Sequence, residues 1–319
     1  MMRRQWTPLL LLGLSAAVGC GNDVTAPEPT VLTILAHYQQ TGENLLINSD
    51  GHAVGSLGPT TVNMVPIGAY VADGTIVLLT DDGIALTTLS HPETIDTVIR
   101  PRPVTMSMVS FAPGGASFAL VSYNPVAAVL LYERANRRLD TLSMGTANPA
   151  LPPVFSPDGR RIALITVTDL GMQVTLIEPG APTQPSTAPF QISRILNRPL
   201  FGWPRWTDDG ILMAFRRVAE DGPDTLLVGI VQPDDPNVPL QERYRAVMAP
   251  VSDEQPEIFF GPSSTYALSE SGDAVVIAAF ASVKTTAHSL YLARPDVSRI
   301  QIVEDDPAAQ LSFAQFINN

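Results

Sequence analysis

The sequence predicts an all-β fold, a β-propeller, and three observations support it. A turn followed by an apolar strand recurs five times along the chain, and helical periodicity is hard to find. The 29 prolines argue further against long helices. Apolar side chains make up 45% of the residues, which is enough to bury a large core.

The recurring unit is an aromatic or apolar residue, a polar turn that ends in glycine, and an apolar run rich in branched side chains. The five copies are AYVADGTIVLLT (69–80), FAPGGASFALVS (111–122), FSPDGRRIALIT (155–166), WTDDGILMAFRR (206–217) and LSESGDAVVIAA (268–279). Their aligned glycines are Gly74, Gly115, Gly159, Gly210 and Gly272, with spacings of 41, 44, 51 and 62 residues. Such lengthening is expected where loops absorb insertions and strands do not.

The chemistry of the turn is clearest in the third copy. Pro157 sets the backbone angle of the first corner, Asp158 tolerates the second, and Gly159 takes the positive φ that the hairpin needs. We therefore interpret Asp158, and Asp209 in the next copy, as turn residues and not as catalytic acids.

Each copy is followed by candidates for two more strands. Third strands are expected at residues 129–134, 172–178, 225–231 and 289–295, and more polar outer strands at 137–143, 243–248 and 299–303. Four strands per unit, with the outermost carrying more charge, are typical of a propeller blade.

The five hairpins give five blades, and the chain ends supply a sixth. Residues 30–37 and 43–57 suit the later strands of a blade whose innermost strand is missing, and residues 310–317 suit that innermost strand. Pairing of the two ends would close the ring and remove two open sheet edges. The sequence thus predicts a six-bladed propeller of four-stranded antiparallel blades. Seven blades are the alternative, because the interval from Gly210 to Gly272 is long enough for extra strands.

FSPDGRRIAL, with LLYERANRRLDTLS and LLINSDGHAVGSL, resembles the repeat of TolB-type six-bladed propellers. The resemblance covers about residues 30–317, although only Ser156–Gly159 matches the family's turn in full. Members of this family are often interaction platforms, so the resemblance implies a binding role. The sequence contains no G-x-S-x-G nucleophile elbow, so we do not expect the activity of a serine hydrolase.

The first twenty residues have the layout of a secretory signal. Arg3 and Arg4 precede an apolar run over residues 9–18, and the segment ends AVGC, which resembles the lipobox of bacterial lipoproteins. Cys20 is the only cysteine, so no internal disulfide can form and lipidation is the economical explanation; an ordinary signal peptide with an incidental thiol is the alternative. The expected organisation is a signal peptide over 1–19, the lipidated Cys20 with a flexible tether over 20–29, and a single propeller domain over 30–319.

The residue after the cysteine bears on location. By resemblance to lipoprotein sorting, Gly21 in place of an aspartate favours the outer membrane. Without Arg3 and Arg4 the chain carries 17 basic against 31 acidic side chains. Such a surface repels nucleic acid and anionic lipid headgroups and suits the periplasm or the exterior.

The sequence names no catalytic residue, metal ligand or cofactor. The histidines His37, His52, His91 and His288 show no zinc-binding spacing. Acidic clusters at 208–209, 220–224, 234–235 and 304–306 lie in expected turns and do not match a calcium loop. A composite metal site at the axis, built from distant residues, stays open as the basis of an alternative enzyme of the lactonase or hydrolase type.

The candidates for ligand or partner binding lie in the connections between blades. These connections and the loops between second and third strands are expected to line one face. The candidates are Arg100, Arg102, Arg198, Trp203 and Arg205. Trp206 aligns with Phe155 and Phe111, so we interpret it as core.

The function predicted is that of a monomeric, non-enzymatic, lipid-anchored propeller that binds an envelope protein. The alternatives are the metal-dependent enzyme and a carbohydrate- or peptide-binding module.

The anchoring hypothesis gives a direct test. Replacing the acylated thiol in Cys20→Ala removes the lipid and should move the protein from the membrane to the soluble fraction. Fractionation followed by immunoblotting measures this, and a variant that still fractionates with membranes would refute the anchor.

Overall fold

A computed structural model divides the chain into two compact units, Met1–Thr30 and Val31–Asn319. All described residues belong to the second unit. They are residues 32–38, 41–59, 64–70, 72–101, 103, 108–123, 128–143, 151–168, 171–179, 197–217, 224–235, 237–248, 265–280, 288–296, 300–304 and 311–316. Among these, no helix has the length and apolar character needed to cross a membrane.

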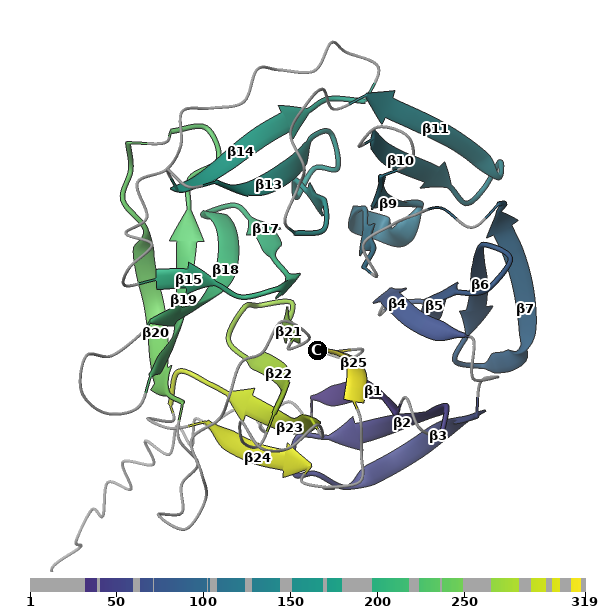
Figure 1. Cartoon of the computed structure of the whole chain (residues 1–319), viewed down its shortest axis with the longest axis horizontal. Helices are drawn as coiled ribbons and strands as arrows, with labels where there is room; N and C mark the ends of the chain where they lie inside the picture. The colour runs from purple at the N-terminus through teal and green to yellow at the C-terminus, as the bar shows by residue number, and fades with distance from the viewer. Residues whose placement is uncertain are drawn as a thin grey trace, which may run out of the picture. The chain divides into compact units, whose positions relative to one another are not determined.

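The second unit is a ring of six small β-sheets around an axis, which confirms the predicted six-bladed propeller and rules out seven blades (Figure 1). Blade 1 consists of β25 (Leu311–Phe316), β1 (Thr33–Tyr38), β2 (Glu43–Asn48) and β3 (Ala53–Pro59). Blade 2 consists of β4 (Val65–Tyr70), β5 (Thr75–Leu79), β6 (Ile84–Thr88) and β7 (His91–Ile99). Blade 3 consists of β8 (Ser110–Phe111), β9 (Ser117–Ser122), β10 (Ala128–Glu133) and β11 (Arg138–Ser143).

The remaining three blades follow in chain order. Blade 4 has the described strands β12 (Val154–Phe155), β13 (Ile162–Thr168) and β14 (Gly171–Ile177). Blade 5 consists of β15 (Asn197–Pro199), β17 (Arg205–Thr207), β18 (Gly210–Arg217), β19 (Thr225–Val231) and β20 (Gln241–Val247). Blade 6 consists of β16 (Gly202–Trp203), β21 (Thr265–Leu268), β22 (Val275–Phe280), β23 (His288–Ala293) and β24 (Gln301–Glu304). The one helical element among the described residues is a 3-10 turn, Pro113–Gly115.

The repeated turns form as the sequence predicts. All five aligned glycines have a positive φ, between 68° and 127°. In the third copy, Ser156 Oγ donates a hydrogen bond to Asp158 Oδ1 at 2.6 Å, and the Arg160 N–H donates to the same oxygen at 3.0 Å. These two hydrogen bonds, the Ser156 bond first, lower the pKa of Asp158, which confirms its role as a turn residue.

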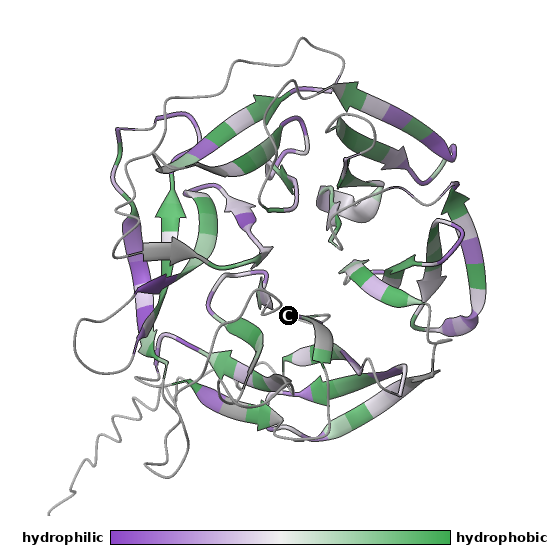
Figure 2. Ribbon diagram, in the orientation of Figure 1, coloured by the Kyte–Doolittle hydropathy of each residue, from purple (hydrophilic) through white to green (hydrophobic). Residues whose placement is uncertain are grey.

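The core lies between the blades. Strands β5 and β22 are second strands whose described side chains are buried, and each of the five buried apolar clusters joins residues of neighbouring blades. Outer strands such as β20 and β7 are more hydrophilic and more exposed (Figure 2). Each blade therefore buries its faces against its neighbours, and its outer edge meets solvent.

The chain ends close the ring as predicted. β25 pairs antiparallel with β1, so that Phe316 lies opposite Ile34 and Ala314 opposite Ala36. The Gln315 side chain also spans to blade 2, where it accepts a hydrogen bond from the Ala69 N–H at 3.0 Å and donates one to the Ala69 carbonyl at 3.3 Å.

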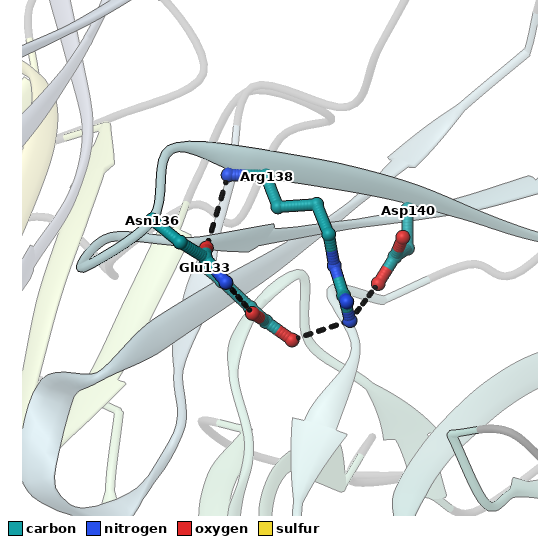
Figure 3. Close-up of polar contacts among 4 residues, drawn as sticks. All are labelled: Glu133, Asn136, Arg138 and Asp140. Atoms are coloured by element: carbon teal, nitrogen blue, oxygen red, sulfur yellow. Dashed lines mark hydrogen bonds and ion pairs between the residues drawn. The ribbon is translucent and has the colours of Figure 1, made fainter.

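The turn between β10 and β11 is fixed by its own polar side chains (Figure 3). Arg138 Nη2 donates to both Glu133 and Asp140 at 2.8 Å, and Asn136 donates to Glu133 at 2.7 Å. The Arg138 N–H completes the network by donating to Asn136 Oδ1.

The turn between β10 and β11 lies on one face of the ring, which we call the turn face. It carries the turns between first and second strands and those between third and fourth strands. Ion pairs between neighbouring blades there include Arg134–Asp73 at 2.7 Å, Arg161–Asp234 at 2.8 Å and Arg243–Asp273 at 2.9 Å. The three carboxylates are exposed, so we attribute to these pairs the alignment of neighbouring blades more than bulk stability.

Ring closure predicts a position-dependent cost for one substitution. Leu311 on β25 is 1% exposed, whereas Leu139 on the outer strand β11 is 40% exposed. Leu311→Ala should lower the free energy of unfolding by about 2–5 kcal/mol, because it leaves a cavity in the closing blade. Leu139→Ala is the same chemical change at an exposed position, so it should lower the free energy of unfolding by well under half as much. Urea unfolding measures both variants. Equal costs would show that β25 contributes little to the ring.

A buried histidine predicts a pH dependence. His37 Nδ1 donates to Asn44 Oδ1 at 2.8 Å, and burial lowers the pKa of His37 although the Asn44 bond partly opposes this. The unfolded chain therefore takes up a proton as the pH falls through 6.5, whereas the folded protein does not until lower pH. Stability should fall from that pH downward. His37→Gln should flatten this part of the pH profile of the melting temperature, and an unchanged slope would contradict the assignment.

Candidate functional site

A hollow with a volume of about 980 Å³ lies on the propeller axis. Its wall takes residues from the innermost strand of every blade, namely β25, β4, β8, β12, β17 and β21, and from β16. Of these strands, Figure 1 labels β4, β17, β21 and β25 around the axis. A cavity of this size is in the range that holds a small ligand or part of a protein partner.

The repeat builds the wall in two rings. The position four residues before each turn glycine supplies Tyr70, Phe111, Phe155, Trp206 and Leu268. The position two residues before each glycine supplies Ala72, Pro113, Pro157, Asp208 and Glu270. The second set is exposed and the first is part-buried or buried, so the second set forms the rim and the cavity opens on the turn face.

The first strand of blade 5 is interrupted, and this interruption shapes the cavity. β15 and β17 both pair with β18, while the Gly202–Trp203 pair between them leaves blade 5 and joins β21 in parallel. The Tyr266 N–H donates to the Phe201 carbonyl at 3.1 Å. A Cβ atom at Gly202 would overlap the Tyr266 carbonyl oxygen, so only glycine permits this close approach.

The interruption places Trp203 at the axis. Its indole Nε1–H donates to the Val109 carbonyl of blade 3 at 3.0 Å, and the side chain is 7% exposed. Alanines of blades 2, 6 and 1 belong to the same buried cluster, Ala69, Ala267 and Ala314. Their small side chains leave room for the indole, which lines the cavity.

Aromatic side chains cover one part of the wall. The Tyr70 and Phe111 rings lie 5.4 Å apart between centroids, and the backbone of Gly115 packs directly on Tyr70. Farther round, the Arg161 guanidinium lies 5.0 Å above the Trp206 ring.

The charged part of the wall lies in blades 5 and 6. Arg205 is the one cationic side chain among the described wall residues, and its Nη2 atom lies 3.4 Å from Glu270 Oε1. Burial lowers the pKa of the Arg205 guanidinium, and Glu270 partly offsets this. Asp208 is exposed at the rim.

The structure brings together two of the five candidate residues. Trp203 and Arg205 line the cavity. Arg100 is exposed at the end of β7 beside Gly83, away from the wall. Arg198 lies in β15 with its backbone opposite Arg216, and Arg102 lies outside the described residues.

The sequence analysis did not identify the two sets of residues that form the cavity wall and its rim. Both could have been found from the aligned repeats, because the two positions recur at fixed distances from the glycines. Trp206 is buried in the core cluster of blades 4 and 5, as expected, and also borders the cavity. Loops between second and third strands, expected on the ligand face, lie in large part outside the described residues.

Within the described residues, no group of three histidine, cysteine, aspartate or glutamate side chains is placed to hold a metal ion. Since parts of the chain lie outside the description, the composite metal site stays an untested hypothesis.

Known proteins share the fold at low sequence identity. No family model and no curated protein matches the sequence. TolB from Acinetobacter baumannii superposes with a TM-score of 0.60 at 11% identity, over 90% of this chain and 66% of that one, just under two thirds of its length. A protein from Agrobacterium tumefaciens assigned as TolB gives 0.53 at 14% identity over 90% and 98%. A structure of a nidogen/laminin complex gives 0.57 at 11% identity, over 90% and 98%. The chain therefore has the fold of TolB-type six-bladed propellers.

The axial position of Trp203 predicts the effect of two substitutions. Trp203→Phe keeps a ring but removes the N–H, so the Val109 carbonyl loses this hydrogen bond at a cost of about 1–2 kcal/mol. Trp203→Ala also leaves a void where the buried indole packs and should cost about 3–5 kcal/mol. Urea unfolding measures both, and a Trp203→Phe variant as stable as the parent would exclude a stabilising role for the hydrogen bond.

Proposed function

We propose that this protein is a lipid-anchored β-propeller of the bacterial envelope that binds a protein partner through the axial cavity and its rim. The observation that carries the proposal is the cavity itself, to which all six blades contribute and whose rim is exposed on the turn face. Its aromatic, proline and alanine residues with few charged groups suit binding more than bond-making chemistry.

The fold supports a binding role in general. The propeller of similar fold in the nidogen/laminin structure belongs to a complex of two proteins. The TolB proteins of similar fold are bacterial. Both likenesses concern the fold alone, so the partner of this chain has to be sought through its own cavity.

The sequence supports the location. We infer export by the signal over residues 1–19, lipidation at Cys20 and sorting to the outer membrane, facing the periplasm or the exterior. The acidic surface left after processing fits a protein that approaches neither nucleic acid nor anionic headgroups by charge. We propose a monomeric, non-enzymatic binding module.

Site-specific cross-linking in intact cells tests the binding role. A photo-reactive phenylalanine analogue in place of Asp208, an exposed rim residue, should give one dominant adduct with an envelope protein, because the rim lies in the interface. The matched control replaces Val54, which is 58% exposed on the outer strand β3. Mass spectrometry identifies the adducts. No adduct from position 208, or the same adducts from both positions, would refute the proposal.

A further inference from the structure

We propose that the axial cavity recognises a carboxylate carried on an aromatic or large apolar body, and that Arg205 binds the carboxylate. The inference rests on the proposed function, because it names the chemistry that a protein partner would insert into the cavity.

The wall has two chemically different halves. In blades 2, 3 and 4 the rim positions are Ala72, Pro113 and Pro157, all without charge. In blades 5 and 6 the corresponding positions are Asp208 and Glu270, next to Arg205. A ligand that fills the cavity therefore meets an apolar surface on one side and ionic groups on the other.

Arg205 is incompletely paired in comparison with the other arginines of the turn face. Its contact with Glu270 is 3.4 Å, whereas the inter-blade pairs of Arg134, Arg161 and Arg243 measure 2.7–2.9 Å. Charge-assisted hydrogen bonds between guanidinium and carboxylate are about 2.7–2.9 Å long. Glu270 therefore leaves the guanidinium fork open to a closer carboxylate.

Desolvation increases the gain from such a carboxylate. The Arg205 side chain is 36% exposed, and the lowered pKa of its guanidinium has burial as its main cause. A partly desolvated guanidinium interacts more strongly with an opposite charge than an exposed one, and its planar fork fits a carboxylate in bidentate geometry.

The two rim carboxylates oppose an anion only weakly. Glu270 is 63% exposed and Asp208 is also exposed, so solvent and salt screen their charges. Glu270 nevertheless competes with the ligand for Arg205. Neutralising Glu270 should therefore strengthen binding of a carboxylate and weaken binding of a cation.

The apolar half of the cavity wall suits the aromatic or large apolar body of the proposed ligand. Tyr70 and Phe111 are both part-exposed toward the cavity and already form a tilted pair. An added aromatic ring gains from a third partner in edge-to-face or offset geometry, and proline rings at the rim extend this surface.

Tryptophan fluorescence of the full chain carrying Trp6→Phe tests the inference. In that protein the two tryptophans, Trp203 and Trp206, both line the cavity. N-acetylphenylalanine should change the fluorescence saturably. N-acetylphenylalaninamide, which lacks the charge, and acetate, which lacks the ring, should bind about tenfold or more weakly.

Two variants assign the effect to Arg205. Arg205→Gln should weaken binding of N-acetylphenylalanine by about tenfold or more, since it removes the charged fork. Glu270→Gln should tighten the same binding. The tightening separates a direct role from simple destabilisation, which would weaken binding in both variants. Thermal melting of both variants confirms folding.

Several results would overturn the inference. These are equal binding of the acid and the amide, equal binding of inorganic phosphate and the acid, weaker binding of the acid in Glu270→Gln, and no saturable change at all. Each result leaves the cross-link from position 208 to be judged separately. Conversely, a failed cross-link with intact Arg205-dependent binding would reject the protein partner and keep the carboxylate site.

Discussion

A propeller blade can bury its two faces only against its neighbours, and the rest of this structure depends on that constraint. Blade 1 takes its innermost strand from the far end of the chain, because β25 pairs with β1 and so closes the ring. The closing blade carries the fully buried side chains Ile34 and Leu35, and they belong to a cluster that reaches into blades 2 and 6. The same pairing satisfies the inner edge of β1, which would otherwise be a free template for other strands.

The ring is regular at its turns and irregular at its axis. Five turns share a glycine with a positive φ at the same position, and ion pairs link several of these turns to the neighbouring blade. At the axis, blade 5 departs from the pattern and sends Trp203 across to blade 3. The regular part therefore fixes the position of the rim, while the irregular part adds Trp203 to the cavity wall. Differences in side chains at equivalent positions then give the cavity an apolar and an ionic half.

Most of the fold could be predicted from the sequence because its determinants are local. Gly159 needs a positive φ, and the same need recurs at four other glycines, so the period of the ring is visible without a structure. The candidate site was less accessible. Gly202 and Trp203 join a blade that is formed more than sixty residues later, and the contact between Arg205 and Glu270 spans a similar distance. Nothing in the local pattern around residues 200–204 repeats in another blade, so no alignment of the copies shows that the strand is broken there.

The strand that closes the ring also forms part of the binding surface. Gln315 and Phe316 of β25 both belong to the cavity wall. A molecule bound in the cavity therefore contacts β25, the strand whose dissociation from β1 would open the ring. Opening the ring would break these contacts. A molecule that binds only the closed ring therefore stabilises that closure. At concentrations above Kd, the added free energy of unfolding grows with the logarithm of the ligand concentration. In this propeller, the strand that closes the ring is also a strand that an occupant of the cavity would contact.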